Sequence, residues 1–250
     1  MAGGNGPFSH LWFGPSLGII DGTGLEVAAP ITSHLTIRAG YSMLPKVYTY
    51  SEDFHIPKIN STLPEADTRL EAWPSARAAN LILDIYPSSS NNFHFSAGVF
   101  YCGKSIATAT NTIPLPSQYS TTGLTVYKDD SPASADMYVV KADANGYATL
   151  DLRAKNRLMP YLAIGVGQPD PDRIFSMLVD VGVMYSGGLG FYAEGTNILG
   201  NTEDVRLTSN TIGKNKNGTF HDHGWLDKLN NDTIFKFIPS ARLTFLFKLF

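Results

Sequence analysis

Residues 237–250 read FIPSARLTFLFKLF, a stretch in which apolar and polar side chains alternate. After Arg242, the odd positions are apolar, and they hold Leu243, Phe245, Phe247 and Leu249. A period of two is typical of a β-strand with one apolar and one polar face. The last residue, Phe250, falls on the polar side of this pattern. We therefore expect either a bulge near the end of the strand or an aromatic side chain at its rim.

Two folds could use such a strand. In a membrane-spanning barrel, apolar side chains contact lipid and polar side chains line the interior. The alternative is an edge strand of a soluble β-sandwich. An edge strand this apolar would expose backbone hydrogen-bonding groups beside a hydrophobic surface and would promote aggregation. The stretch therefore favours the barrel.

The same alternation recurs along much of the chain. From Leu35 to Met43, apolar residues occupy the odd positions, whereas Thr36, Arg38 and Ser42 occupy even positions. Further segments with an alternating or apolar pattern are 11–20, 24–30, 79–85, 93–102, 148–155, 160–167, 175–185 and 189–196. Depending on how the first hairpin is counted, the sequence predicts about eight to ten strands.

The connections between these segments alternate in length. Short links at 31–34, 87–92, 156–158 and 186–188 alternate with longer ones at 44–76, 105–146, 168–173 and 198–236. Up-and-down membrane barrels have short turns on one rim and long loops on the other. The sequence thus predicts an all-β fold, a transmembrane antiparallel up-and-down barrel. We expect residues 1–250 to form one domain, with the longest connections as irregular loops.

Composition narrows the function classes. The net charge of −3 gives no reason to expect nucleic acid. Charged residues make up 16% of the chain, below the ~25% usual for soluble domains. The chain contains no run of about 18 apolar residues, the length that would predict a transmembrane helix. The single cysteine, Cys102, cannot form an intrachain disulfide. The first residues lack the features of a signal peptide, so we expect export by a signal that is absent from this chain.

Several paired motifs resemble small outer-membrane β-barrel proteins of Gram-negative, Bacteroidetes-like bacteria, a family of uncertain function. The motifs are GLEVAAP (24–30) with LTIRAGY (35–41), LDIYP (83–87) with FHFSAGV (93–99), and PYLAIGVG (160–167) with VDVGV (179–183). The resemblance implies an outer-membrane location and contact with outer-membrane lipid. It also implies insertion by the barrel-assembly machinery, with residues 243–250 in the closing strand. It carries no catalytic residue to this chain.

Charged residues on the polar face of the strands would lie in the barrel interior. A barrel of this size is about filled by its side chains, and unpaired buried charges are costly. We therefore expect an ion-paired, plugged interior and no cofactor or metal. A narrow passive channel for solutes or ions is the alternative. The residues predicted to form this network are Glu26, Arg38, Asp84, Lys104, Asp151, Arg153, Asp180, Glu194 and Arg242.

Enzymatic activity is a further alternative, because lipid-modifying enzymes exist among outer-membrane barrels. His94 and Ser96 stand two residues apart and could join an acid in a triad. No nucleophile-elbow motif accompanies them, and the sequence favours a protein that is not an enzyme. His221-Asp222-His223 and Asp227 could hold a metal, although a solvated polar loop explains them better.

The long connections 44–76, 105–146 and 198–236 are the predicted interaction surfaces, through which the protein would bind a partner or join an envelope complex. Asp232-Thr233-Ile234 resembles the acceptor motif for O-glycosylation in Bacteroidetes, which makes Thr233 a candidate modification site.

Overall fold

The computed structural model describes residues 10–46, 49–56, 58, 61–88, 92–127, 137–207 and 236–249. Regular structure in these ranges is almost entirely β-strand, and the α-helix α1 (Ser117–Thr121) has five residues. No helix in the described ranges combines the length and the apolar character needed to cross a membrane.

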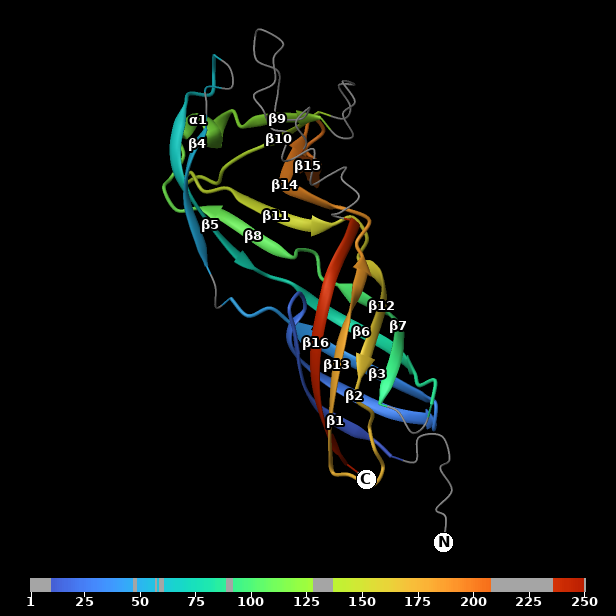
Figure 1. Cartoon of the computed structure of the whole chain (residues 1–250). Coiled ribbons are helices and arrows are strands. Elements are labelled where there is room, and N and C mark those ends of the chain that lie inside the picture. Colours follow the sequence, from blue (N-terminus) through green and yellow to red (C-terminus); the bar gives the residue numbers. More distant parts are fainter. Residues whose placement is uncertain are drawn as a thin grey trace.

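Eight strands form a closed antiparallel barrel (Figure 1). They are β1 (Trp12–Gly18), β2 (Gly22–Thr32), β3 (Leu35–Met43), β6 (Arg77–Ile85), β7 (Phe93–Cys102), β12 (Leu158–Val166), β13 (Phe175–Tyr185) and β16 (Phe237–Lys248). Around the barrel their order is β1-β16-β13-β12-β7-β6-β3-β2. Each barrel strand is therefore hydrogen-bonded to the barrel strands before and after it in the chain. The predicted all-β, up-and-down barrel is confirmed, with the lower of the predicted strand numbers.

Strand β16 closes the barrel by pairing with β1 on one side and β13 on the other. Its even-numbered residues from Ile238 to Leu246 are buried, whereas its odd-numbered residues are half-buried or exposed. Leu243, Phe245 and Phe247 thus lie on the outer face, and Leu249 just beyond the strand is exposed. Phe250 lies outside the described residues, so the expectation of a terminal bulge or rim position stays a prediction.

A second sheet lies mainly in the three long connections, where we had expected irregular loops. Its strands are β4 (Tyr50–Ile56), β5 (Ala66–Pro74), β8 (Ala107–Asn111), β9 (Leu124–Tyr127), β10 (Met137–Val140), β11 (Thr149–Ala154), β14 (Leu189–Asn197) and β15 (Thr202–Leu207). The irregular-loop prediction was wrong because strands such as β5 and β8 are half-exposed and carry Thr, Ala and charged residues, which give no apolar alternation. The segments 148–155 and 189–196, predicted as barrel strands, are β11 and β14 of this sheet.

This second sheet, here named the extension, continues one side of the barrel wall (Figure 1). Strands β5, β8, β11 and β14 pair in the same order as the barrel strands β6, β7, β12 and β13 that adjoin them in the chain. Backbone hydrogen bonds cross the junction, for example from Ser75 N to Ile106 O at 2.8 Å and from Asn156 N to Ser186 O at 2.8 Å. Four barrel strands therefore extend beyond the rim, and the described ends of the chain lie at the opposite rim.

Two apolar clusters fill the ends of the barrel interior. The cluster near the extension contains Ala78, Ile82, Phe100, Met159, Tyr161, Ala163, Met184 and Ile238. The cluster near the chain ends contains Trp12, Ala28, Leu178 and Leu246. Along β13 and β16, the buried Asp180 and Arg242 come between residues of the two clusters. A layer of buried charge is thus enclosed by apolar side chains above and below.

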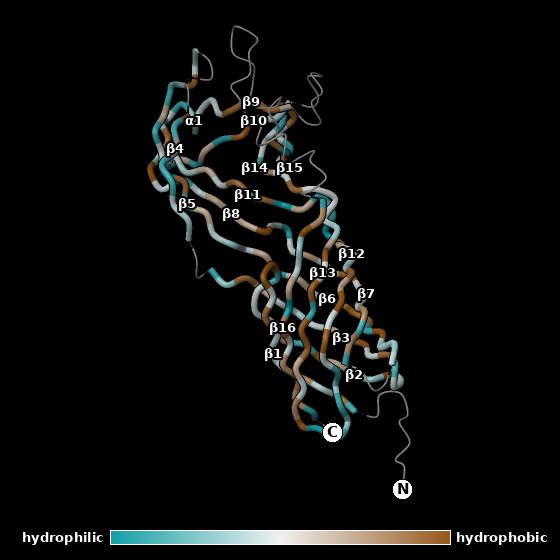
Figure 2. The backbone as a smooth tube through the Cα atoms, viewed as in Figure 1, coloured by the Kyte–Doolittle hydropathy of each residue, from teal (hydrophilic) through white to brown (hydrophobic). Residues whose placement is uncertain are grey.

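Exposed apolar side chains cover the outside of the barrel. Figure 2 shows brown, hydrophobic segments alternating with paler ones along the barrel strands. Every barrel strand contributes to this surface, here named the apolar belt, with side chains such as Phe13, Leu25, Tyr41, Leu81, Phe95, Leu162, Val181 and Phe247, each between 37% and 63% exposed. The alternation along each strand therefore directs apolar groups outward and polar groups inward.

Candidate functional site

Arg38 lies at the centre of the buried charge. It is an inward-facing residue of β3 and its side chain is fully buried. Its Nε lies 2.6 Å from Asp84 Oδ2, and its Nη1 lies 2.9 Å from Asp180 Oδ2 and 3.4 Å from Glu26 Oε1. One guanidinium therefore faces three carboxylates from three other strands, β2, β6 and β13.

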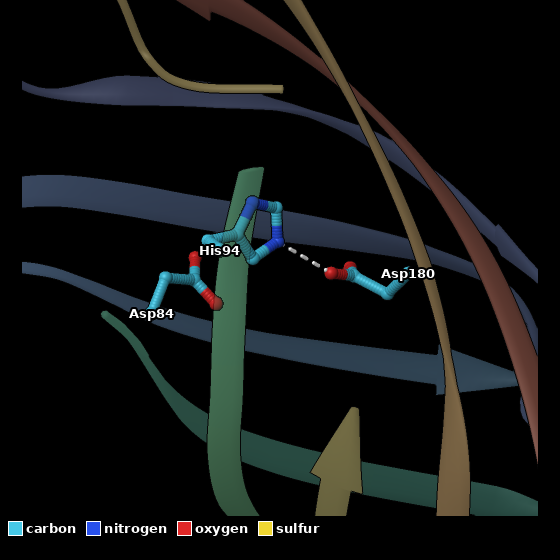
Figure 3. A group of neighbouring side chains, drawn as sticks. All are labelled: Asp84, His94 and Asp180. Carbon is cyan, nitrogen blue, oxygen red and sulfur yellow. Dashed lines mark hydrogen bonds and ion pairs between the residues drawn. The ribbon is translucent and has the colours of Figure 1, made fainter. Parts of the chain in front are cut away.

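His94 extends this group on the side facing the chain ends. In the register of the sheet, His94 on β7 and Asp180 on β13 both pair with Gly165 on β12. The imidazole Nε2 reaches across the glycine to Asp180 Oδ1 at 2.8 Å (Figure 3). A Cβ on Gly165 would collide with both partners. The Tyr86 ring packs against His94, with 5.1 Å between the two ring centroids. Glycine is therefore needed for this bond to form.

Arg242 forms a second cationic centre closer to the extension. Its Nη2 lies 3.1 Å from Glu26 Oε2, and its Nη1 lies 3.4 Å from Asp21 Oδ2. Nη2 also donates to Ser16 Oγ at 3.0 Å. Its guanidinium carbon lies 5.5 Å from the centre of the Phe100 ring, and Phe100 belongs to the apolar cluster near the extension. Glu26 joins the two centres, because one of its oxygens faces Arg38 and the other faces Arg242.

We name these seven titratable side chains the charged layer: Asp21, Glu26, Arg38, Asp84, His94, Asp180 and Arg242. None of them is more than 4% exposed. Four carboxylates face two guanidinium groups in this layer.

The layer offers limited chemistry. Asp84, His94 and Asp180 present three potential metal-ligand atoms within 4.8 Å of one another. Arg38, however, contacts both carboxylates and already supplies positive charge there. Ser96 Oγ donates to Asp84 at 2.7 Å, and its hydrogen bonds run to carboxylates and Arg38. No hydrogen bond links Ser96 to His94 among the described residues, so the geometry of a nucleophile and its base is not formed there.

Five of the nine residues predicted for the interior network meet in the charged layer: Glu26, Arg38, Asp84, Asp180 and Arg242. The other four, Lys104, Asp151, Arg153 and Glu194, lie at the junction or in the extension.

A smaller ionic group in the extension contains three of these four. Arg153 contacts Asp151 at 2.7 Å and Asp204 at 2.8 Å, and Lys104 contacts Asp204 at 2.8 Å. Hydrogen bonds from the Arg153 guanidinium, followed by that from Lys104, lower the pKa of the Asp204 carboxyl to about 2. Glu194 is exposed on β14. The sequence had placed Asp151, Arg153 and Glu194 in the barrel because their strands alternate like barrel strands.

Sequence reasoning missed Asp21 and Asp204 and treated His94 as a possible triad member. Asp21 belongs to the tight turn between β1 and β2, where Ser42 Oγ donates to it at 3.0 Å. Turn residues carry no inside-or-outside signal, so nothing in the pattern pointed to it. Asp204 stands in a segment that we had expected to be a loop. His94 and Ser96 are two residues apart on β7 and therefore point to the same, inward side. This spacing was the signal in the sequence that placed His94 in the interior.

Besides Phe250, two sequence predictions fall outside the described residues. They concern the modification site Thr233 and the metal candidates His221, Asp222, His223 and Asp227.

Together, the fold and the charged layer define a closed eight-stranded barrel with an apolar exterior, an ion-paired interior and a sheet-like extension on one rim. A scan against protein-family models finds no match, and neither does a search of curated proteins.

Solved structures with a similar arrangement include two proteins from Acinetobacter baumannii. CarO2 is 18% identical, with a TM-score of 0.49 over 98% of this chain and 100% of its own. CarO is 14% identical, with a TM-score of 0.46 over 96% of this chain and 97% of its own. A major outer membrane protein from Thermus thermophilus is 11% identical, with a TM-score of 0.41 over 96% of this chain and 99% of its own. These are low values, and the Bacteroidetes-like origin stays a prediction.

Proposed function

We propose that the chain is an integral outer-membrane β-barrel whose interior is sealed, which is not an enzyme, and which acts by binding a partner through the extension. The apolar belt is the observation that carries this proposal. Contiguous exposed apolar surface on a soluble monomer rarely exceeds a few hundred Å². Here exposed apolar side chains from all eight strands surround the barrel, and a lipid bilayer is the environment that matches an apolar ring.

The height of the apolar belt supports the membrane location. Phe175 and Tyr185 bound the outward face of β13, ten residues apart. At about 3.3 Å per residue and a tilt of about 40°, this separation corresponds to about 25 Å along the barrel axis. That is the height of the apolar band in outer-membrane barrels.

Aromatic side chains mark both edges of the apolar belt. Phe13, Phe247 and Phe175 are neighbours in one row on β1, β16 and β13, near the chain ends. Tyr185 and Phe237 pair at the other edge, with ring centroids 5.3 Å apart. Aromatic residues are enriched at the two membrane interfaces. The two rows therefore support a membrane boundary at each edge.

The filled interior favours a sealed barrel over a passive channel. Apolar clusters stand on both sides of the charged layer, and side chains such as Trp12, Phe100 and Leu246 are at most 1% exposed. The same burial argues against catalysis at Ser96 or His94. Neither residue is more than 2% exposed, whereas a catalytic group must be within reach of its substrate.

One set of experiments tests membrane location and sealing. Refolded protein is mixed with phospholipid vesicles, and folding is followed by the mobility of unboiled and boiled samples on gels. We expect insertion, a mobility change on boiling, and no steady conductance in planar bilayers. A protein that stays monodisperse without detergent would contradict the membrane location, and steady single-channel currents would contradict the sealed interior.

The extension is proposed as the interaction surface, together with connections 44–76, 105–146 and 198–236, which contribute six of its eight strands. Its strands are half-exposed on both faces where β5, β8 and β11 pair. We expect an envelope protein to bind there, and the barrel-assembly machinery to act on the closing strand β16 during insertion. Pull-down from mild detergent should recover a stoichiometric partner from the intact chain. It should not do so from a variant in which a short Gly-Ser linker replaces residues 105–156; equal recovery would contradict this role.

A further inference from the structure

We propose that Arg77 and Arg157 form a binding site for the phosphate group of a lipid headgroup, at the edge of the apolar belt next to the extension. The proposal rests on the membrane location proposed above.

The backbone places the two arginines on either side of one strand. Arg77 begins β6, and Arg157 immediately precedes β12. At the end of β7, Cys102 N donates to Arg157 O at 2.8 Å and Gly103 N donates to Arg77 O at 2.6 Å. Since neighbouring strands lie about 4.8 Å apart, the two arginine backbones are separated by about 10 Å.

Both side chains are at the outer surface. Arg77 is exposed and precedes the buried Ala78, so it continues the outward row that contains Leu81. The Arg157 guanidinium carbon lies 4.9 Å from the centre of the Tyr101 ring, and its Nε donates to Cys102 O at 3.4 Å. Tyr101 is 52% exposed on the outside of β7. The guanidinium is thus held at the level of the aromatic edge.

Neither arginine has an acidic partner among the described residues, and the neighbouring Lys155 is likewise exposed. The cations at the opposite rim differ. Arg173 Nε lies 3.1 Å from Asp170 Oδ2, and Lys248 Nζ donates to Pro171 O at 2.6 Å. In the described part of the chain, Arg77 and Arg157 therefore stand without a carboxylate partner, whereas Arg173 at the opposite rim has one.

A phosphorylated lipid would match both the arginines and the apolar side chains next to them. Guanidinium groups bind phosphate through paired, charge-assisted hydrogen bonds. Acyl chains below them would contact the outward side chains Leu81, Tyr101 and Leu158, which are between 49% and 56% exposed. A basic residue near an anionic lipid surface strengthens binding about fivefold, so two should give about thirtyfold.

The test measures lipid binding to the whole protein. Detergent-solubilised protein is titrated with lipid A, and bound lipid is quantified by native mass spectrometry. The double variant Arg77→Gln/Arg157→Gln is compared with the wild type and with Arg173→Gln, an exposed arginine at the opposite rim. We expect about thirtyfold weaker binding for the double variant and wild-type binding for Arg173→Gln. Dephosphorylated lipid A should bind wild type as weakly as lipid A binds the double variant.

Three results would overturn the proposal. Equal binding by the wild type and the double variant would remove the arginines from the site. Equal binding of lipid A and its dephosphorylated form would remove phosphate recognition. Full displacement of lipid A by millimolar inorganic phosphate would identify a free-anion site and not a lipid site. Failure of the proposed function gives a different result, since a protein outside the membrane would fail to insert into vesicles in all variants, whereas here the double variant should still insert and shift on boiling.

Discussion

Replacing Arg38 by methionine removes the cation that faces Glu26, Asp84 and Asp180. Breaking a buried ion pair by removing one partner typically destabilises a protein by about 3–5 kcal/mol. A second route gives a similar figure. One carboxylate that loses its counter-charge can take up a proton, which at pH 7 costs about 4 kcal/mol because the pH lies about three units above an ordinary carboxyl pKa. We therefore expect Arg38→Met to lower the free energy of unfolding by about 4 kcal/mol at pH 7.

The pH dependence distinguishes lost charge compensation from lost packing. The folded variant binds one proton more than the wild type, so lowering the pH stabilises it relative to the wild type. The deficit should shrink by about 1.4 kcal/mol per pH unit, to about 1.2 kcal/mol at pH 5. Urea unfolding in phospholipid vesicles, followed by tryptophan fluorescence, measures both values.

Two further variants make this prediction specific. Arg38→Met/Asp84→Asn removes one charge of each sign and should recover much of the stability at pH 7 without the pH trend. Arg69→Met breaks an exposed pair, in which Nε lies 2.8 Å from Asp53 Oδ1, and should cost less than about 1 kcal/mol. A deficit below about 1 kcal/mol for Arg38→Met, or one that is constant between pH 5 and pH 8, would refute the reasoning.

Three other predictions follow from the same structure. Gly165→Ala should destabilise the barrel by about 1–3 kcal/mol through displacement of the His94–Asp180 contact, while Gly103→Ala, where a Cβ finds ordinary contacts, should be near neutral in the same urea assay. Val181→Arg, in the middle of the apolar belt and 57% exposed, should cost about 2–4 kcal/mol in vesicles, and no loss of stability would contradict lipid contact there. The lowered pKa of Asp204, about 2, means that its ion pairs stabilise the extension above pH ~4 and are lost as the pH falls towards 2; pepsin cleavage of the extension should rise over that window, and Asp204→Asn should abolish the change.

The barrel strands were predictable because each one meets a different medium on each face. Leu243 and Arg242 are neighbours in the chain, yet one points outward and the other into a filled interior. The resulting period of two is independent of long-range contacts. The extension was not predictable in this way. On β8, ATATN, Ala alternates with Thr, but all four of these residues are half-buried, so the two faces differ little in polarity and the periodic signal is weak.

The charged layer was partly predictable for the same reason. Parity identified Arg38 and Asp180 as inward, but parity cannot tell which inward charges lie at the same height. That depends on the register between strands, which brings Asp180, Gly165 and His94 side by side on β13, β12 and β7. Asp151 and Arg153 share the alternating pattern, but the chain bend at the junction places them in the extension. Register and bends arise from pairing across the sheet and leave little trace in one strand.

The charged layer also gives a physical reason why the barrel adopts one register. An interior made of apolar side chains alone would accept several alignments of neighbouring strands with similar packing. Sliding β3 by one residue relative to its neighbours would turn Arg38 to the apolar exterior, which costs about 2–4 kcal/mol in the proposed membrane location. It would also leave Asp84 and Asp180 without their shared guanidinium. Both penalties arise from the same shift of register. The alternation that places charged side chains inside the barrel is the one that places apolar side chains outside. The ion pairs therefore select the register in which the aromatic rows align on opposite edges of the barrel, even if their net contribution to stability is small.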